Sequence, residues 1–135
     1  MTTRSKILLL TLFGLIFHSC SLSVDPKQLI GDYYLNEGAG KDSIFIVKGN
    51  KYIHRYTTDE GKVFESTSNW KLNSGGNLIL FEDFVFFTND VGYNKRRGGN
   101  WFSRIRVSSK GQIDLIYSRE NNIFYRKVLK KQGNN

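Results

Sequence analysis

Apolar residues recur along the chain in short runs that polar clusters separate. The runs are rich in β-branched and aromatic residues, and glycine, asparagine, aspartate and serine gather between them. Alternation is visible inside some runs, where Ile105 and Val107 face one way while Arg104 and Arg106 face the other. A period of two is typical of strands with one buried face, so the pattern predicts an all-β fold.

The runs predict eight or nine strands joined mostly by hairpin-length connections. We expect strands over residues 32–35, 43–47, 51–57, 62–72, 77–87, 101–108, 112–117 and 123–130, with a break near Glu82 and Asp83. Residues 88–100 form one longer loop. This spacing favours an antiparallel barrel or sandwich, and closure into a barrel would remove the exposed edges.

A single helical turn is predicted before the first strand. Asp25 suits the N-cap, because its carboxylate accepts bonds from backbone N–H groups, and Pro26 suits the first helical position. Gly31 ends the turn almost at once. No later stretch has a helical period of useful length.

The most apolar segment lies outside this pattern, at the N-terminus. Arg4 and Lys6 precede an apolar run over residues 7–17, and small serine residues follow. This order is typical of a secretory signal peptide, and 11 residues are too few for a membrane-spanning helix. We therefore expect residues 1–19 to be a cleaved leader.

Cys20 is the only cysteine of the chain, and an odd cysteine in an exported protein needs an explanation. With Ser19 before it, Cys20 resembles the lipid-carrying cysteine of a bacterial lipoprotein. The resemblance implies thioether-linked diacylglycerol and a palmitate-type acyl chain. It also implies a membrane anchor with residues 20–25 as a tether. Ser21 is not the Asp of an inner-membrane retention signal, which favours the periplasmic face of the outer membrane.

Two alternatives explain the same residues without an anchor. Phe17 and His18 depart from the Leu and small residue that usually stand at −3 and −2 of a lipoprotein signal. An ordinary signal peptidase cutting after Ser21 or Ser23 would remove Cys20 and give a soluble secreted or periplasmic protein. A retained free thiol is the other alternative.

Composition indicates one folded domain, over residues 26–131. The chain has 135 residues, of which 39% are hydrophobic, with ten Phe, seven Tyr and two Trp. The run "NWKLNSGGNLIL" and the order of a helical turn followed by Gly31-Asp32-Tyr33 are similar to small bacterial lipoproteins with a lipocalin-like barrel. The resemblance implies structural roles for Gly31 and Tyr33, and a basic last-strand residue, Arg126, packed over Tyr33.

Charge is distributed unevenly. The formal net charge is +8, but residues 20–91 carry −3 and residues 92–135 carry +9. We expect the binding residues of the basic half to be Lys95, Arg96, Arg97, Trp101, Arg104 and Arg106. A solvated face, attraction to anionic headgroups or glycans, and an acidic protein partner all remain open explanations. The export signal argues against nucleic acid, although "NKRRGGNWF" has the basic and aromatic character of a nucleic-acid-binding loop.

Residues for catalysis are scarce. After the leader, His54 is the only histidine, and no pattern marks the serine and carboxylate that a nucleophilic mechanism needs beside it. No spacing of His, Cys or acidic residues suggests a metal site. We expect a binding protein without catalysis, metal or cofactor. It would take an apolar ligand into the barrel mouth or, alternatively, act as an inhibitor or immunity-type module on an acidic partner.

Overall fold

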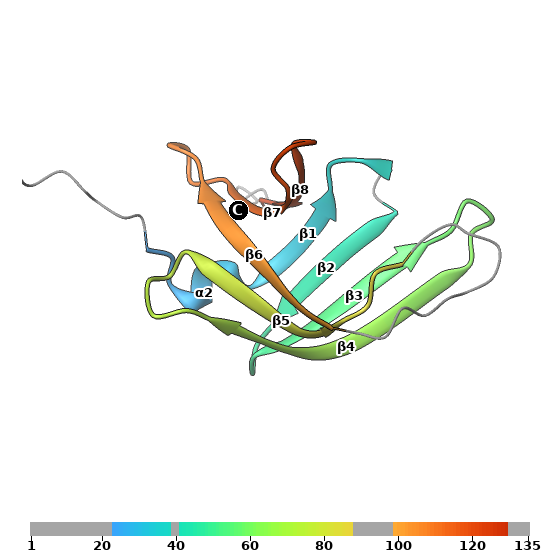
Figure 1. The fold of residues 1–135 in the computed structure, drawn as a ribbon, viewed down its shortest axis with the longest axis horizontal. Coiled ribbons are helices and arrows are strands. Elements are labelled where there is room, and N and C mark those ends of the chain that lie inside the picture. Colours follow the sequence, from blue (N-terminus) through green and yellow to red (C-terminus); the bar gives the residue numbers. More distant parts are fainter. Residues whose placement is uncertain (1–22, 39–40, 88–98, 130–135) are drawn as a thin grey trace, which may run out of the picture.

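The computed structural model describes residues 23–38, 41–87 and 99–129. Within them, eight antiparallel strands close into a barrel after one helical turn (Figure 1). The elements are α2 (Pro26–Leu29), β1 (Gly31–Leu35), β2 (Asp42–Val47), β3 (Lys51–Thr57), β4 (Val63–Leu72), β5 (Leu78–Phe84), β6 (Gly99–Val107), β7 (Ile113–Ser118) and β8 (Ile123–Lys127). The all-β prediction is confirmed, and the fold is a barrel rather than a sandwich.

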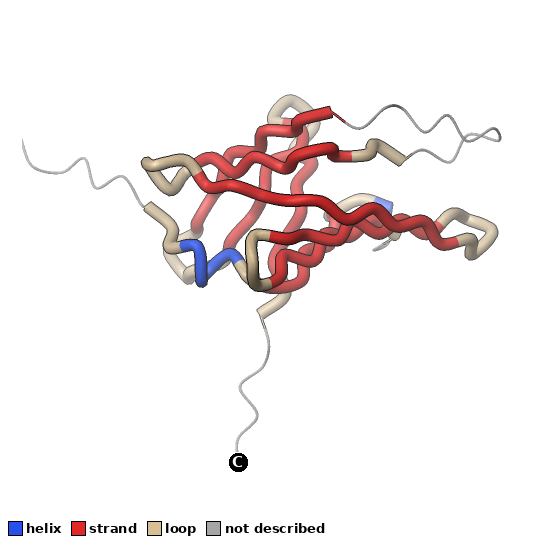
Figure 2. The backbone as a smooth tube through the Cα atoms, turned by 90° about the horizontal axis from the view of Figure 1, so that it is seen from below, coloured by secondary structure: helices blue, strands red, loops and turns tan. Residues whose placement is uncertain are grey.

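The strands follow one another around the barrel in sequence order. Each strand pairs with the next, and β1 pairs with β8 to close the ring. Figure 2 shows these strands surrounding a common interior, with the helical turn at one end. This simple up-and-down order is consistent with a lipocalin-like fold.

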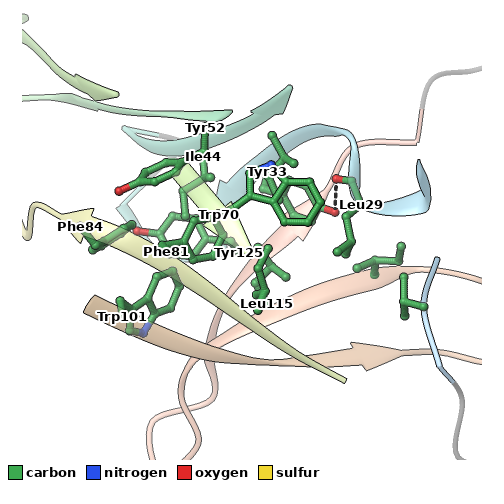
Figure 3. Packing of buried hydrophobic residues seen from close by; sticks show 14 residues of the cluster. Leu29, Tyr33, Ile44, Tyr52, Trp70, Phe81, Phe84, Trp101, Leu115 and Tyr125 are labelled. Carbon is green, nitrogen blue, oxygen red and sulfur yellow. Dashed lines mark hydrogen bonds between the residues drawn. The ribbon is translucent and has the colours of Figure 1, made fainter. Parts of the chain in front are cut away.

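One face of each strand supplies the core. Alternating residues point inward, so Tyr52 and His54 on β3 are buried while Arg55 on the same strand is exposed. Aromatic rings fill the middle of the barrel: Phe81 stacks on Trp101 at 5.2 Å between ring centroids, and Phe84 lies 4.6 Å from Trp101 (Figure 3). The middle of the barrel is therefore packed with side chains.

The predicted strand bounds need small corrections. The break expected near Glu82 and Asp83 is present: Asp83 has a φ of 50°, and the pairing of β5 with β6 is irregular there. Strand β6 begins at Gly99, two residues before its predicted start, and β8 ends at Lys127, before its predicted end.

The two ends of the barrel differ. We call the end that carries Val24, α2 and the turn over residues 73–77 the closed end. The opposite end, formed by the β1–β2, β3–β4 and β7–β8 connections, is the mouth. In Figure 1, α2 lies beside the β4–β5 hairpin, and the β3–β4 hairpin lies at the far side of the molecule.

Backbone and side-chain bonds seal the closed end. The N-cap prediction is confirmed, because the Asp25 side chain accepts a bond from the Lys27 N–H and the Gln28 side chain accepts one from the Asp25 N–H. The Tyr33 hydroxyl donates to the Leu29 carbonyl at 2.8 Å (Figure 3). The Val24 N–H donates to the Gly76 carbonyl at 3.0 Å, which holds the segment before α2 against the β4–β5 turn.

Candidate functional site: the barrel mouth

A cavity of about 500 Å³ opens at the mouth. Its size lies in the range that holds a small organic molecule. The lining residues come from both halves of the chain: Leu35, Glu37, Gly38, Lys41, Asp42, Tyr56, Asp59, Phe87, Tyr117 and Tyr125. The cavity is thus aromatic on its walls and carries several charged groups.

Asp42 is the carboxylate most deeply placed in this cavity. It is the first residue of β2 and has the inward orientation of Ile44 and Ile46 on the same strand. Its Oδ1 lies 2.7 Å from His54 Nε2 and accepts a bond from the Tyr125 hydroxyl at 3.0 Å. Its side chain is 14% exposed, so it is reachable from the mouth but mostly shielded from water.

The charge of Asp42 contributes to the raised pKa values of three tyrosines. Burial raises the pKa of Tyr117, and the negative charge of Asp42 raises it further. Burial, Asp42 and the hydrogen bond to Asp42 together raise the pKa of Tyr125 well above its ordinary value. The pKa of Tyr56 is raised by burial, then by Asp59 and Asp42, against an opposing effect of Lys41. The three phenols stay protonated at neutral pH and face a negative field.

Packed aromatic side chains form the floor of the cavity. The His54 imidazole stacks on Phe84 at 4.4 Å between centroids, and Trp101 lies 5.7 Å from Tyr117 and 5.8 Å from Tyr125. Trp101 was expected among the binding residues. The structure places it inside the core, 9% exposed, one layer below the cavity.

His54 has a carboxylate partner that the sequence pattern did not mark. Because β2 pairs with β3, Asp42 comes to lie beside the imidazole. Ser66 is directly opposite His54 on β4, but neither the Ser66 hydroxyl nor His54 Nδ1 has a hydrogen-bond partner among the described residues. Ser66 and His54 therefore do not form the hydrogen bond by which a base activates a nucleophilic serine.

Across residues 23–38, 41–87 and 99–129, no three His, Cys, Asp or Glu side chains are placed to hold a metal ion. None of the helical residues in these ranges belongs to a helix long and apolar enough to cross a bilayer.

The basic residues of the C-terminal half lie on the outer wall. Arg104 and Arg106 of β6, with Arg119 of the β7–β8 turn, line a shallow groove of about 320 Å³ over Phe124. Neither Arg104 nor Arg119 forms an ion pair with a described residue. Cys20, Lys95, Arg96 and Arg97 lie outside the described residues.

Arg106 and Arg126 share the buried carboxylate of Asp114 on this wall. The nearest contacts are 2.9 Å from Arg106 Nη2 and 3.0 Å from Arg126 Nε. Both guanidinium groups also lie over the Phe124 ring, within 4.8 Å of its centroid. Burial raises the pKa of Asp114, but the bonds from Arg126 and Arg106 outweigh this and hold it below the ordinary value.

Lys127, rather than Arg126, is the basic residue beside Tyr33. Arg126 projects from the outer face because its neighbours Tyr125 and Lys127 point inward, and Lys127 is directly across from Tyr33 in the β1–β8 pairing. The Lys127 ammonium donates to the Gln28 carbonyl of α2. Gly31 has a φ of 148°, and a Cβ there would come within 2.7 Å of Lys127 Cε, so glycine suits the position.

Comparisons of the chain with protein-family models, with curated proteins and with solved structures found no significant match.

Proposed function

We propose that this protein is a lipid-anchored binding protein of the cell envelope, and that its lipocalin-like barrel takes a small ligand into the mouth. The cavity of about 500 Å³, walled by tyrosine and phenylalanine, is the observation that supports the binding function. Because the middle of the barrel is packed, the ligand would occupy only the part of the interior at the mouth, near Tyr56, Tyr117 and Tyr125. No catalysis is proposed.

Binding can be measured with a fluorescent probe. N-phenyl-1-naphthylamine brightens in apolar surroundings, and Trp101 lies close enough to the cavity tyrosines to report on a bound ligand. We expect saturable binding that a Tyr56→Ala substitution weakens. Phe102→Ala is the matched control, because Phe102 is an exposed aromatic residue on the outer wall. Absence of saturable binding would contradict the proposal.

The lipid anchor is supported by Ser19 and Cys20 after the apolar leader. The proposed location is the periplasmic face of the outer membrane. Expressed in a bacterial host, the wild-type chain should incorporate labelled palmitate and sediment with membranes, while Cys20→Ser should do neither. Membrane retention of Cys20→Ser without a lipid label would contradict the anchor and leave the barrel function untouched.

A second function is favoured by the outer groove. Arg104 and Arg119 make no ion pair with any described residue, so an acidic protein partner could use both. The double reversal Arg104→Glu and Arg119→Glu should reduce capture of such a partner. The capture that remains should depend less on salt concentration. Lys110→Glu with Lys48→Glu changes net charge equally at other exposed positions and serves as the control.

A further inference from the structure

The described residues that line the mouth cavity carry more negative than positive charge, although the chain as a whole is basic. Among the described lining residues there are three carboxylates, at Glu37, Asp42 and Asp59, and one ammonium group, that of Lys41. Lys41 forms an ion pair with Asp59 at the rim, so the positive charge of Lys41 is largely neutralised there. Glu37 and Asp42 form no ion pair with a lysine or arginine of the described residues.

Asp42 has one oxygen available for a ligand. Both of its hydrogen bonds, from His54 and from Tyr125, end on Oδ1. Within the described part of the chain, Oδ2 accepts no hydrogen bond. A mostly buried carboxylate is costly unless its oxygens are paired, which makes Oδ2 a strong acceptor for a donor that enters from the mouth.

Aromatic faces surround this carboxylate. Tyr56 stacks on Phe87 with ring centroids 5.8 Å apart, and Tyr117 meets Tyr125 edge to face at 6.1 Å. The faces of aromatic rings are electronegative and attract organic cations, most strongly where water is excluded. Aromatic walls beside a carboxylate combine apolar contact with attraction for positive charge.

We propose that the ligand of the mouth is an organic ammonium compound, whose charged nitrogen pairs with Asp42 and whose apolar body lies against Tyr56, Tyr117 and Tyr125. This inference rests on the proposed function, since it names the ligand class of the same cavity. An anionic ligand would meet Glu37 and Asp42 at close range and be repelled. A purely apolar ligand would cover the Asp42 oxygen without replacing its contact with water.

The test uses three probes of similar size whose end groups differ in charge. Phenethylamine, phenethyl alcohol and phenylacetate share one ring and a similar chain, but they are cationic, neutral and anionic at pH 7. We expect the mature chain to bind phenethylamine at least about tenfold more tightly than the alcohol in calorimetry, and phenylacetate more weakly still. This series needs no variant, so it does not depend on the folding of a mutant.

Substitution of Asp42 tests whether this carboxylate causes the preference for a cationic probe. Asp42→Asn keeps the size of the side chain and an oxygen that accepts bonds, so it should lose the preference for phenethylamine and keep binding to N-phenyl-1-naphthylamine. Asp83→Asn is the matched control, because it removes the same charge from an exposed position whose positive φ suits asparagine. Its probe preferences should match those of the wild type.

The outcomes separate the two proposals. Equal affinity for the three probes, or tightest binding of phenylacetate, would overturn the ammonium inference while leaving the mouth as a binding site. The same conclusion follows if Asp42→Asn keeps the full preference for phenethylamine. If neither the charge series nor N-phenyl-1-naphthylamine binds, the proposed function fails together with this inference.

Discussion

The closed end and the mouth of the barrel use the same kinds of residue for opposite purposes. At the closed end, Leu29 and Tyr33 are fully buried, and the Tyr33 hydroxyl is bonded to backbone. At the mouth, Tyr117 is 40% exposed, and the Tyr125 hydroxyl meets a carboxylate instead. Burial and satisfied polar groups therefore stabilise the fold at one end, while the other end leaves part of its tyrosine surface exposed, as the proposed binding function requires.

Among the substitutions that test this comparison, Leu29→Ala should have the largest effect on stability. Leu29 is the fully buried residue of α2, so its truncation should lower the free energy of unfolding by about 2–5 kcal/mol. Urea denaturation measures the loss. Under conditions where the variant is folded, binding of N-phenyl-1-naphthylamine should stay within twofold of the wild type. A large change in probe affinity would show that the two ends are coupled.

Gly76→Ala tests how Val24 is held at the closed end. Gly76 has a φ of 64°, and a Cβ there would lie 2.9 Å from the Val24 backbone nitrogen. We expect a loss of about 1–3 kcal/mol in unfolding free energy from strain and displacement of Val24. Gly111→Ala is the matched control, since Gly111 has a φ of 75° with no neighbour within 4 Å of the added carbon. Equal losses in both variants would mean that the Val24 contact contributes nothing.

Tyr33→Phe has a smaller effect that depends on pH. The variant leaves the Leu29 carbonyl without its donor, which should cost about 1 kcal/mol at pH 7. Burial raises the pKa of Tyr33 above its ordinary value of 10, so its contribution to stability is complete below pH 10 and is lost as the pH rises above that. The stability difference between wild type and variant should therefore shrink from pH 9 to pH 11 in urea titrations. A constant difference would exclude this linkage.

Tyr117→Ala should have the smallest effect on stability. Its ring is part of the cavity wall and is 40% exposed, so the loss should stay within about 1 kcal/mol. Binding of N-phenyl-1-naphthylamine should nevertheless weaken severalfold. Tyr34→Ala, at a similarly exposed tyrosine on the outer face of β1, should leave probe binding unchanged. Equal binding losses in the two variants would contradict a specific site at the mouth.

Local chemistry made the barrel predictable from sequence. Alternation, turn residues and the Asp25-Pro26 helix start are signals within a few residues, and each matches the structure. The break at Asp83 was also visible, because two adjacent acids interrupt an apolar run. Errors of one to three residues at strand ends arise because pairing partners, which are distant in sequence, decide where a strand stops.

The site was less predictable because it depends on register around the barrel. Asp42, His54 and Tyr125 meet only once β2, β3 and β8 are placed, and nothing near Asp42 in the sequence marks it as a cavity residue. Register also decides that Lys127 rather than Arg126 lies across from Tyr33. Lys127 faces inward because it is two residues after Tyr125 on the same strand. Recognising this from the sequence would have required the register in which β8 pairs with β1.

The bond between Val24 and Gly76 has a consequence for orientation. Val24 is the fourth residue after Cys20, and a chain of that length reaches about 14 Å at most. If Cys20 is acylated, the bilayer therefore lies beneath the closed end, and the cavity opens toward the aqueous compartment. A ligand would then arrive from solution, or from another protein, rather than by lateral diffusion out of the lipid.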